Sequence, residues 1–398
     1  MSRMSELIER LKKIAEEEQL IKLELQSQNL EEAYEIINAE GSKRKSNRVE
    51  NIRKQKKIAK VAVDKIRIKG LNGTIGSNLI RLADEIVIKD KRSQYFSYLS
   101  RNSILDISNN KKNSQVALLG GAFVKGFLKK YEYPQPEPWS LPTPFNFEKC
   151  DGTRSLLQKY KEIDIYQPRD EYERILKRIS VHILYPFAYN ISSLEDNYLK
   201  QCSEQTLLVR YWANLFEYYF STEQNVFLQW GDTISLSCKQ AKLLFKLDIR
   251  LISKKHTSEM DVANGEVASV ASSTKSKYYI DALKLTLSSK QHLNDFVSSL
   301  PLLTAEDVVQ IKMPIIQILG MNCHISCLQI VDKNVYFSQD IFSFSYPKTI
   351  KEVKKGAINN IITGLDLIKV CISTINTYVV RNLMVSFDLY LEHDDGTG

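Results

Sequence analysis

Two acidic residues, Asp248 and Glu266, lie 18 positions apart in the chain and could form a metal site. Asp248 belongs to the apolar run FKLDIRLIS, and Glu266 belongs to the shorter run NGEVAS, which follows a polar turn. Carboxylate oxygens are hard ligands that suit Mg²⁺, and this ion polarises a phosphodiester and activates a water. The alternative is that both acids are surface carboxylates on a β-hairpin.

The pattern around these acids predicts an α/β domain from about residue 146 onward. Helix-like runs cover 169–187 and 204–220, and the second run is strongly amphipathic. Strand-like runs follow at NVFLQWGDT, KLDIRLIS and DVANGEVAS, and then comes a helix, KYYIDALKLTLSSKQHLNDFVSSL. We expect two or three further strands after it and a long helix over about 349–382 that closes the fold.

Local features of these elements give further predictions. Pro186 is expected to end the helix that starts at 169, because the residue before a proline avoids helical geometry. His182 lies on the apolar face of that helix and is expected to be a core histidine. In the run CHISC, Cys323 and Cys327 share one strand face, which predicts core packing in preference to a zinc site.

The order of elements resembles the restriction-endonuclease-like fold of the PD-(D/E)XK type, in which a mixed sheet is flanked by helices. In that family an Asp and a Glu-x-Lys converge on Mg²⁺, and the lysine stabilises developing negative charge. The resemblance implies that Asp248 and Glu266 are catalytic and bind Mg²⁺. Position 268 is Ala268, so the resemblance implies Lys290 in the next helix as the catalytic lysine. It also implies Glu217 as a further metal ligand.

The chain resembles, more narrowly, a group of uncharacterised fungal proteins with the same type of core. The shared order reads RYWANLFEYYF, FKLDIRL, NGEVA and KLTLSSKQHL, and it covers roughly 200–380. This chain departs from the group at Leu287, where a basic residue is usual. Two functions therefore stay open: a nucleic-acid-associated Mg²⁺-dependent nuclease, and a non-enzymatic interaction or scaffold protein with a degenerate site.

The N-terminal part predicts a different organisation. Apolar residues over 4–38 keep the four-three spacing of a short coiled coil, which would bind a protein partner or a second copy. A single amphipathic helix that packs on the chain's own core is the alternative. The predicted domains are a coiled-coil-like helix with a basic arm (1–70), a helical segment with a proline-rich linker (71–145) and an α/β nuclease-like domain (146–398).

Positive charge is concentrated in the basic arm. Residues 41–70 contain 12 Lys or Arg against two acids, although the net charge of the whole chain is only +8. Such clusters suit nucleic-acid backbones or an import receptor, and a solvated charge run is the alternative. The candidate nucleic-acid-binding residues are Lys43, Arg44, Lys45, Arg53, Lys54, Lys56 and Lys57.

Composition argues against a secreted or membrane protein. The start, MSRMSELIERLKK, is charged and lacks the apolar region of a secretory signal. The most apolar stretch, 358–380, contains Asp366 and Lys369, so we expect a buried helix and no membrane span. Six scattered cysteines without a CxxC pair fit reduced thiols in an intracellular protein of the nucleus or cytoplasm.

Overall fold

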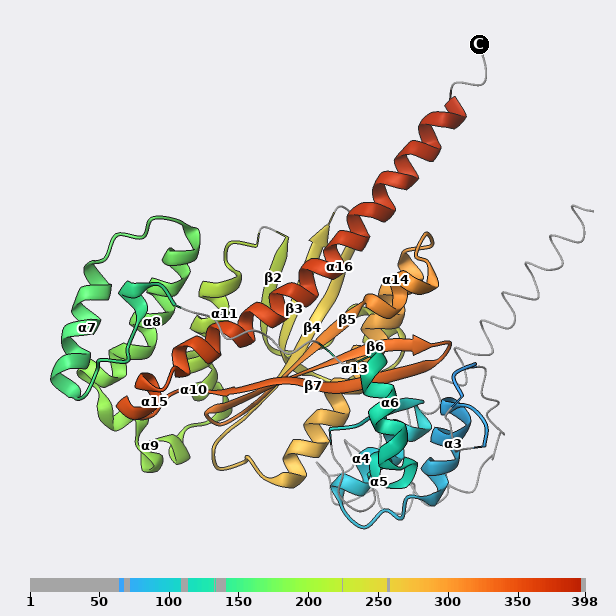
Figure 1. Cartoon of the computed structure of the whole chain (residues 1–398), viewed down its shortest axis with the longest axis horizontal. Helices are drawn as coiled ribbons and strands as arrows, with labels where there is room; N and C mark the ends of the chain where they lie inside the picture. Colours follow the sequence, from blue (N-terminus) through green and yellow to red (C-terminus); the bar gives the residue numbers. More distant parts are fainter. Residues whose placement is uncertain are drawn as a thin grey trace, which may run out of the picture.

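Seven strands form one mixed sheet at the centre of the computed structural model (Figure 1). The structure describes residues 64–67, 72–108, 114–131, 133, 141–223, 225–255 and 258–394. The strands are β1 Ile104–Asp106, β2 Val226–Thr233, β3 Leu247–Lys255, β4 Ser258–Ala268, β5 Lys312–Leu319, β6 Asn322–Asp332 and β7 Val335–Ser345. Their order across the sheet is β1-β7-β6-β5-β4-β3-β2. A mixed sheet flanked by helices confirms the predicted α/β class.

Pairing within the sheet follows the chain closely. β1 pairs with β7 and β4 pairs with β5 in parallel, and the remaining neighbours are antiparallel. The β3–β4 and β6–β7 hairpins form where the sequence alternates apolar side chains around polar turns. Asn334 adopts a φ of +58° in the second turn, a left-handed conformation that asparagine tolerates. The predicted turn at 332–334 is confirmed.

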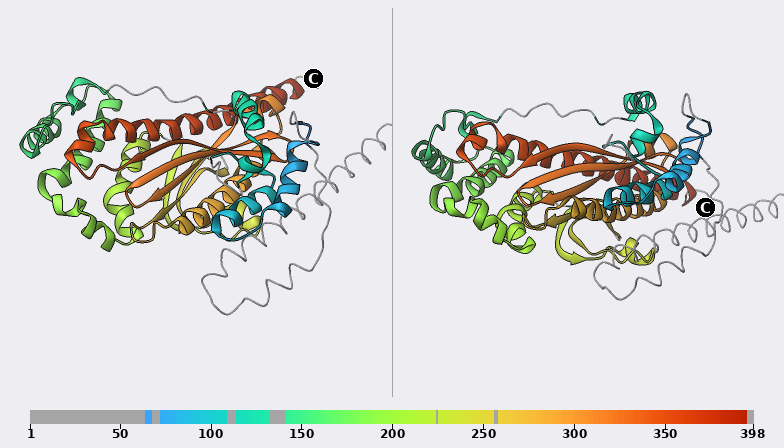
Figure 2. Two further views of the ribbon diagram at one scale, coloured as in Figure 1. Left: turned by 60° about the horizontal axis from the view of Figure 1, so that its bottom comes forward. Right: turned by 90° about the horizontal axis from the view of Figure 1, so that it is seen from below.

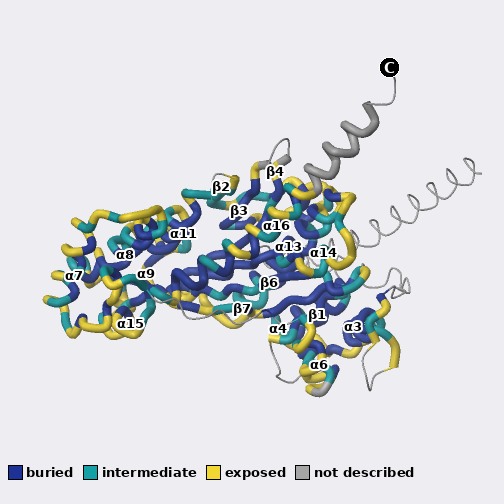
Figure 3. The backbone as a smooth tube through the Cα atoms, turned by 45° about the horizontal axis from the view of Figure 1, so that its top comes forward, coloured by how far each residue is buried: buried dark blue, intermediate teal, exposed yellow. Residues whose placement is uncertain are grey.

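Two long helices, α13 (Lys275–Ser299) and α16 (Ala357–Asp394), cover opposite faces of the sheet (Figure 2). Thr274 caps α13, because its side chain accepts a hydrogen bond from the backbone N–H of Lys277. α16 approaches the sheet closely at Gly364, where a Cβ atom would lie only 2.2 Å from the ring of Phe344. The strands between these helices are therefore buried on both faces, as the dark tube in Figure 3 shows.

A lobe of shorter helices packs at one end of the sheet. Its main elements are α7 (Thr153–Ile165), α8 (Glu171–Tyr189), η2 (Ile191–Leu194), α9 (Asp196–Gln201), α10 (Glu204–Leu207), η3 (Leu208–Trp212) and α11 (Ala213–Phe220). The predicted helix over 204–220 is present, but η3 is a π-helical turn in its middle. The indole N–H of buried Trp212 donates to the carbonyl of Gly320 at 2.9 Å, which joins this lobe to the sheet.

The predicted end of α8 before Pro186 is wrong. The helix continues through Pro186 to Tyr189. The proline carbonyl still accepts a hydrogen bond from Asn190 N–H at 2.8 Å, and the ring is buried. Burial of the ring and the retained carbonyl bond offset the missing proline N–H.

The segment before the proline-rich linker also contributes a strand. β1 pairs with β7, although the sequence predicted only helices there. The other elements are α3 Ile75–Glu85, α4 Lys91–Arg101, α5 Gln115–Leu119, α6 Gly121–Tyr131, η1 Thr143–Phe145, α12 Leu236–Gln240, α14 Ala305–Gln310 and α15 Ile350–Lys354. β1 is short and fully buried, so it joins the sheet through packing more than through its own propensity.

One stretch among the described residues, Ala357–Arg381 of α16, is long and apolar enough to cross a membrane. In this fold 61% of an 18-residue apolar window within that stretch is buried, and its helix contacts strands β4, β5 and β7. A core helix passes the same test of length and composition, so this is weak evidence of a membrane span. The predicted burial of the helix over 358–380 is confirmed.

Candidate active site

The two acids singled out in the sequence lie on neighbouring strands with their side chains on one face. Ile249 of β3 pairs with Gly265 of β4, and the same register extended by one residue sets Asp248 opposite Glu266. Side chains that are directly opposite on paired strands point to the same face. The backbone N–H of Val267 donates to Oδ2 of Asp248 at 2.9 Å, which ties this carboxylate to the strand that carries Glu266.

The lysine at this acid pair is Lys284, from α13. Its Nζ lies 2.6 Å from Oε1 of Glu266, and the two side chains are 17% and 3% exposed. Lys284 therefore places a positive charge beside Glu266, which Ala268 on the same strand as Glu266 cannot supply. Removing either partner of a buried ion pair is costly, because the other is left as an unpaired buried charge.

Lys290, the lysine implied by the resemblance, lies elsewhere on α13. Its Nζ donates to the carbonyl of Asn102 at 3.0 Å and lies 4.8 Å from the ring centre of Tyr336. Six residues of helix rotate a side chain by about 240°, so Lys284 and Lys290 face different directions. The structure therefore places Lys284, and not Lys290, at Glu266.

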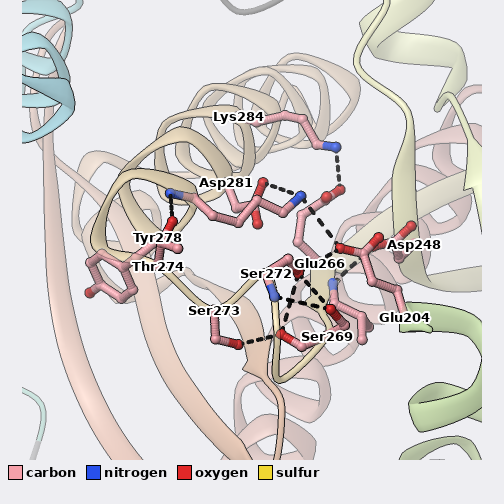
Figure 4. A network of polar contacts seen from close by, with 12 residues as sticks. Glu204, Asp248, Glu266, Ser269, Ser272, Ser273, Thr274, Tyr278, Asp281 and Lys284 are labelled. Carbon is pink, nitrogen blue, oxygen red and sulfur yellow. Dashed lines mark hydrogen bonds and ion pairs between the residues drawn. The ribbon is translucent and has the colours of Figure 1, made fainter. Parts of the chain in front are cut away.

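Further charged residues surround the pair, as Figure 4 shows. Asp281 of α13 is 2% exposed and lies 3.1 Å from Nζ of Lys277. Glu204 of α10 lies 4.0 Å from the same Nζ and accepts a hydrogen bond from Ser272 at 3.2 Å. We call Glu204, Asp248, Glu266, Lys277, Asp281 and Lys284 the acid cluster; it holds four carboxylates against two lysines.

Burial dominates the electrostatics of the acid cluster. It raises the pKa of Glu266 well above its usual range, and Lys284 opposes this rise while Asp248 adds to it. Burial also raises the pKa of Asp281 to about 6 and raises that of Asp248. Burial thus favours the neutral forms of these carboxyl groups, and a bound cation would favour their ionised forms.

Glu217, the expected third ligand, lies outside the acid cluster. Its Oε1 accepts a hydrogen bond from the indole N–H of Trp230 at 2.5 Å, and the residue is exposed on α11. The carboxylate that the helical lobe contributes is Glu204 instead. Glu204 lies on α10, before the π-helical turn, whereas Glu217 lies after it.

A row of polar side chains continues from the acid pair across the sheet. Glu266 pairs with Gln317 of β5, Gln317 pairs with His324 of β6, and His324 pairs with Ser343 of β7. Gln317 donates to the carbonyl of Tyr278 on α13 at 2.8 Å, and His324 bonds to the Ser343 hydroxyl at 2.9 Å. The acid pair is therefore one end of a polar band under the N-terminal half of α13.

The carboxylate oxygens of Asp248 and Glu266 suit a hard cation that keeps several of its water ligands. No group of three His, Cys, Asp or Glu side chains that could hold a metal ion was found in the described part of the chain. Asp248 and Glu266 would thus supply two ligands, with water and substrate oxygens as the others, which is the usual shell of Mg²⁺. Oδ2 of Asp281 is buried without a hydrogen-bond partner and could bind a metal-bound water.

One spacing pattern in the sequence could have identified the lysine of this site. Lys277, Asp281 and Lys284 follow a four-three spacing, which places them on one face of a helix. That spacing, together with the predicted helix, points to Lys284 as the lysine on the same side as Asp281. Glu204 has no comparable signal, because only the tertiary packing of α10 brings it to Lys277.

Three predicted features of the chain fall on residues that the structure does not describe. The coiled-coil-like region 4–38 and the basic residues between Lys43 and Lys57 lie outside the described residues, as do residues 134–140 of the linker.

All six cysteines are described, unpaired and buried, as the prediction of structural thiols requires.

Comparison with known proteins gives no relative. No family model matches the chain, and neither a curated protein nor a solved structure shows significant similarity to it. The function must therefore be argued from the acid cluster itself.

Proposed function

We propose that the chain is a nucleic-acid-associated, divalent-cation-dependent phosphodiesterase with a restriction-endonuclease-like core. One observation carries the proposal: Asp248 and Glu266 lie opposite each other on paired strands, and Lys284 lies 2.6 Å from Glu266. Two carboxylates with an adjacent lysine can hold a cation and neutralise the negative charge that develops on a phosphate.

Each residue has a distinct role in this proposal. Asp248 and Glu266 would hold Mg²⁺, which when bound polarises the phosphodiester and favours ionisation of a water. Lys284 would donate to a phosphate oxygen, since its ammonium lies beside the acids. The carboxyl of Asp281, with a pKa of about 6, can accept a proton near neutral pH, and Lys277 orients it.

A cleavage assay tests the proposal. Wild type and the Asp248→Asn, Glu266→Gln and Lys284→Gln variants are incubated with single-stranded DNA, duplex DNA and RNA in Mg²⁺ or Mn²⁺. We expect each variant to lose activity by roughly 10²-fold or more. Glu217→Gln is the matched control, because it removes a carboxylate that lies outside the acid cluster, and it should cleave like wild type.

Metal binding gives a second readout that does not need turnover. Mn²⁺ titration of the full chain should show one site in wild type that Glu266→Gln weakens and Glu217→Gln leaves intact. Equal cleavage by wild type and Asp248→Asn, or equal Mn²⁺ binding by wild type and Glu266→Gln, contradicts the assignment.

A non-enzymatic interaction or scaffold function is the second candidate. It is favoured by the ion pairs Lys284–Glu266 and Lys277–Asp281, which already satisfy part of the acid charge. It is also favoured by Ala268, which is buried where the resemblance expects a lysine. Absence of cleavage on every substrate, with intact binding of a nucleic acid, would support this candidate over the first.

A further inference from the structure

A second site for a ligand lies in the helical lobe. A pocket of about 630 Å³ opens between α8, η2, η3 and α11. This volume is within the range of small-molecule sites, roughly 300–1,000 Å³. Two arginines line it, and none of its lining residues is an aspartate or a glutamate. A pocket with this lining favours an anion.

Tyrosine side chains contact both arginines of this pocket. Within the part of the chain that the structure describes, neither Arg178 nor Arg210 forms an ion pair with a carboxylate. Arg178 lies over the ring of Tyr218 at 5.9 Å, and Arg210 bonds to the hydroxyl of Tyr198. Arg174, one turn earlier on α8, does pair with Glu171. Guanidinium groups free of acids and held by rings are suited to bind a phosphate.

Aromatic and polar groups complete the pocket. Tyr185 is 52% exposed and packs on Tyr189, with ring centres 5.3 Å apart, so it offers a ring that a planar group could stack on. His182 also lines the pocket; it is partly buried, and its ring lies edge-on to that of buried Tyr346, with ring centres 6.2 Å apart. Burial lowers the pKa of His182, which favours the neutral ring.

The tautomer of His182 follows from its neighbour. Nε2 lies 3.1 Å from the carbonyl oxygen of Tyr211, which can only accept a hydrogen bond. Nε2 therefore carries the proton, and Nδ1 is the acceptor of the neutral ring. Asn190 and Ser193 add further hydrogen-bonding groups to the lining. The pocket thus combines phosphate-binding, stacking and hydrogen-bonding groups.

We propose that this pocket binds a nucleoside phosphate unit, with its phosphate at Arg178 and Arg210 and its base on Tyr185. The unit could be a free nucleotide or one nucleotide of a single strand, since both present the same phosphate and base. Arg210 lies in the π-helical turn η3, and such turns occur frequently at functional sites. This assignment does not depend on the activity proposed for the acid cluster.

Calorimetric titration of the full chain in EDTA tests the proposal. The probes are the four ribonucleoside 5′-monophosphates, their nucleosides, inorganic phosphate and a 5′-phosphorylated single-stranded pentanucleotide. We expect at least one monophosphate to bind tenfold or more tightly than its nucleoside or phosphate alone. Arg178→Gln and Arg210→Gln should each weaken that binding roughly tenfold, the effect of removing one charged hydrogen bond.

Matched variants make the outcome specific. Arg174→Gln removes an arginine from the same helix that does not line the pocket, and it should bind like wild type. Tyr185→Leu should weaken nucleotide binding and leave phosphate binding unchanged. Tighter binding of the pentanucleotide than of any monophosphate identifies a strand as the source, and the reverse order identifies a free nucleotide.

Two results would overturn the assignment: no monophosphate binds better than inorganic phosphate, or Arg178→Gln and Arg210→Gln bind like wild type. Circular dichroism melting of each variant guards against unfolding. Glu266→Gln should retain nucleotide binding in EDTA, so a failure of the acid cluster cannot be mistaken for a failure of this pocket.

Discussion

At the residue scale, burial makes the ionised carboxylates of the acid cluster unfavourable. Asp281 and Glu266 are each 2% exposed, and burial raises the pKa of both. Their lysine partners reduce this cost without removing it. Perturbed carboxyl groups gathered in one place are more common at functional sites than elsewhere, although structural ion-pair networks also produce them.

Asp281→Asn is expected to stabilise the protein above neutral pH. The pKa of Asp281 is about 6 in the native protein against about 3.9 in an unfolded chain. Between these values the native state binds more protons, so its stabilising contribution is complete below pH 4 and declines as pH rises through 6. The variant cannot ionise, so its stability relative to wild type should rise by roughly 3 kcal/mol between pH 4 and pH 8.

Urea unfolding in EDTA at pH 4, 6 and 8 measures this difference. Asp232→Asn is the control for removing a carboxylate, because that side chain is 70% exposed and lies outside the acid cluster. A stability difference for Asp281→Asn that is the same at pH 4 and pH 8 would contradict the pKa on which the expectation depends.

At the scale of elements, α13 and α16 have different roles. α13 carries three residues of the acid cluster on the face that contacts β4 and β5. α16 contributes no residue to the acid cluster and covers the other face of the sheet. It approaches β7 closely at Gly364, where the helix backbone lies against the ring of Phe344.

Gly364→Ala tests that packing. A Cβ atom there would lie 2.2 Å from a ring carbon of Phe344, so the ring or the helix must move. Overpacking of this kind costs about 1–3 kcal/mol. Gly126→Ala in α6 is the matched control, since its Cβ would meet nothing within 4 Å, and it should gain roughly 0.5–1 kcal/mol.

Thermal or urea denaturation of both variants gives the comparison. Adding Phe344→Leu to Gly364→Ala should recover part of the stability, because leucine removes the clashing ring. Equal stabilities for the two glycine variants would show that α16 does not pack closely on β7.

At the scale of the whole molecule, the described part of the chain joins the sheet to two flanking helical regions. β1 ties the region of α3 to α6 onto β7, and Trp212 ties the helical lobe to the loop at Gly320. α10 then brings Glu204 from that lobe to Lys277 of α13. The acid cluster therefore depends on how the helical lobe docks on the sheet. A change in the contact between Trp212 and Gly320 should alter the position of Glu204 relative to Lys277.

Deletion of residues 43–57 tests the predicted basic arm. If the arm binds phosphates, deletion should weaken binding to DNA or RNA and reduce the slope of log affinity against log salt by almost one for each phosphate that the arm neutralises. Deleting 4–38 is the matched control, because it shortens the chain and keeps the arm. Fluorescence anisotropy at several salt concentrations measures both, and an unchanged slope after the first deletion contradicts this role.

How much of the fold and site the sequence predicts differs from element to element. Hydrophobic period and turn residues were enough to predict β2 to β4, two or three strands in the region of β5 to β7, α13 and the buried C-terminal helix, because these patterns are local. They also picked out Asp248 and Glu266 as a pair. They failed at β1 and Pro186, where burial in the assembled core outweighs local preference.

The composition of the acid cluster and the pocket was decided by tertiary structure. The sequence by itself determined that an acid-bearing hairpin precedes a lysine-rich helix. Only the rotation of α13 over the sheet selected Lys284 over Lys290, and only the docking of the lobe supplied Glu204 in place of Glu217. The physical reason is that proximity between distant segments depends on packing geometry, which spacing along one chain does not contain.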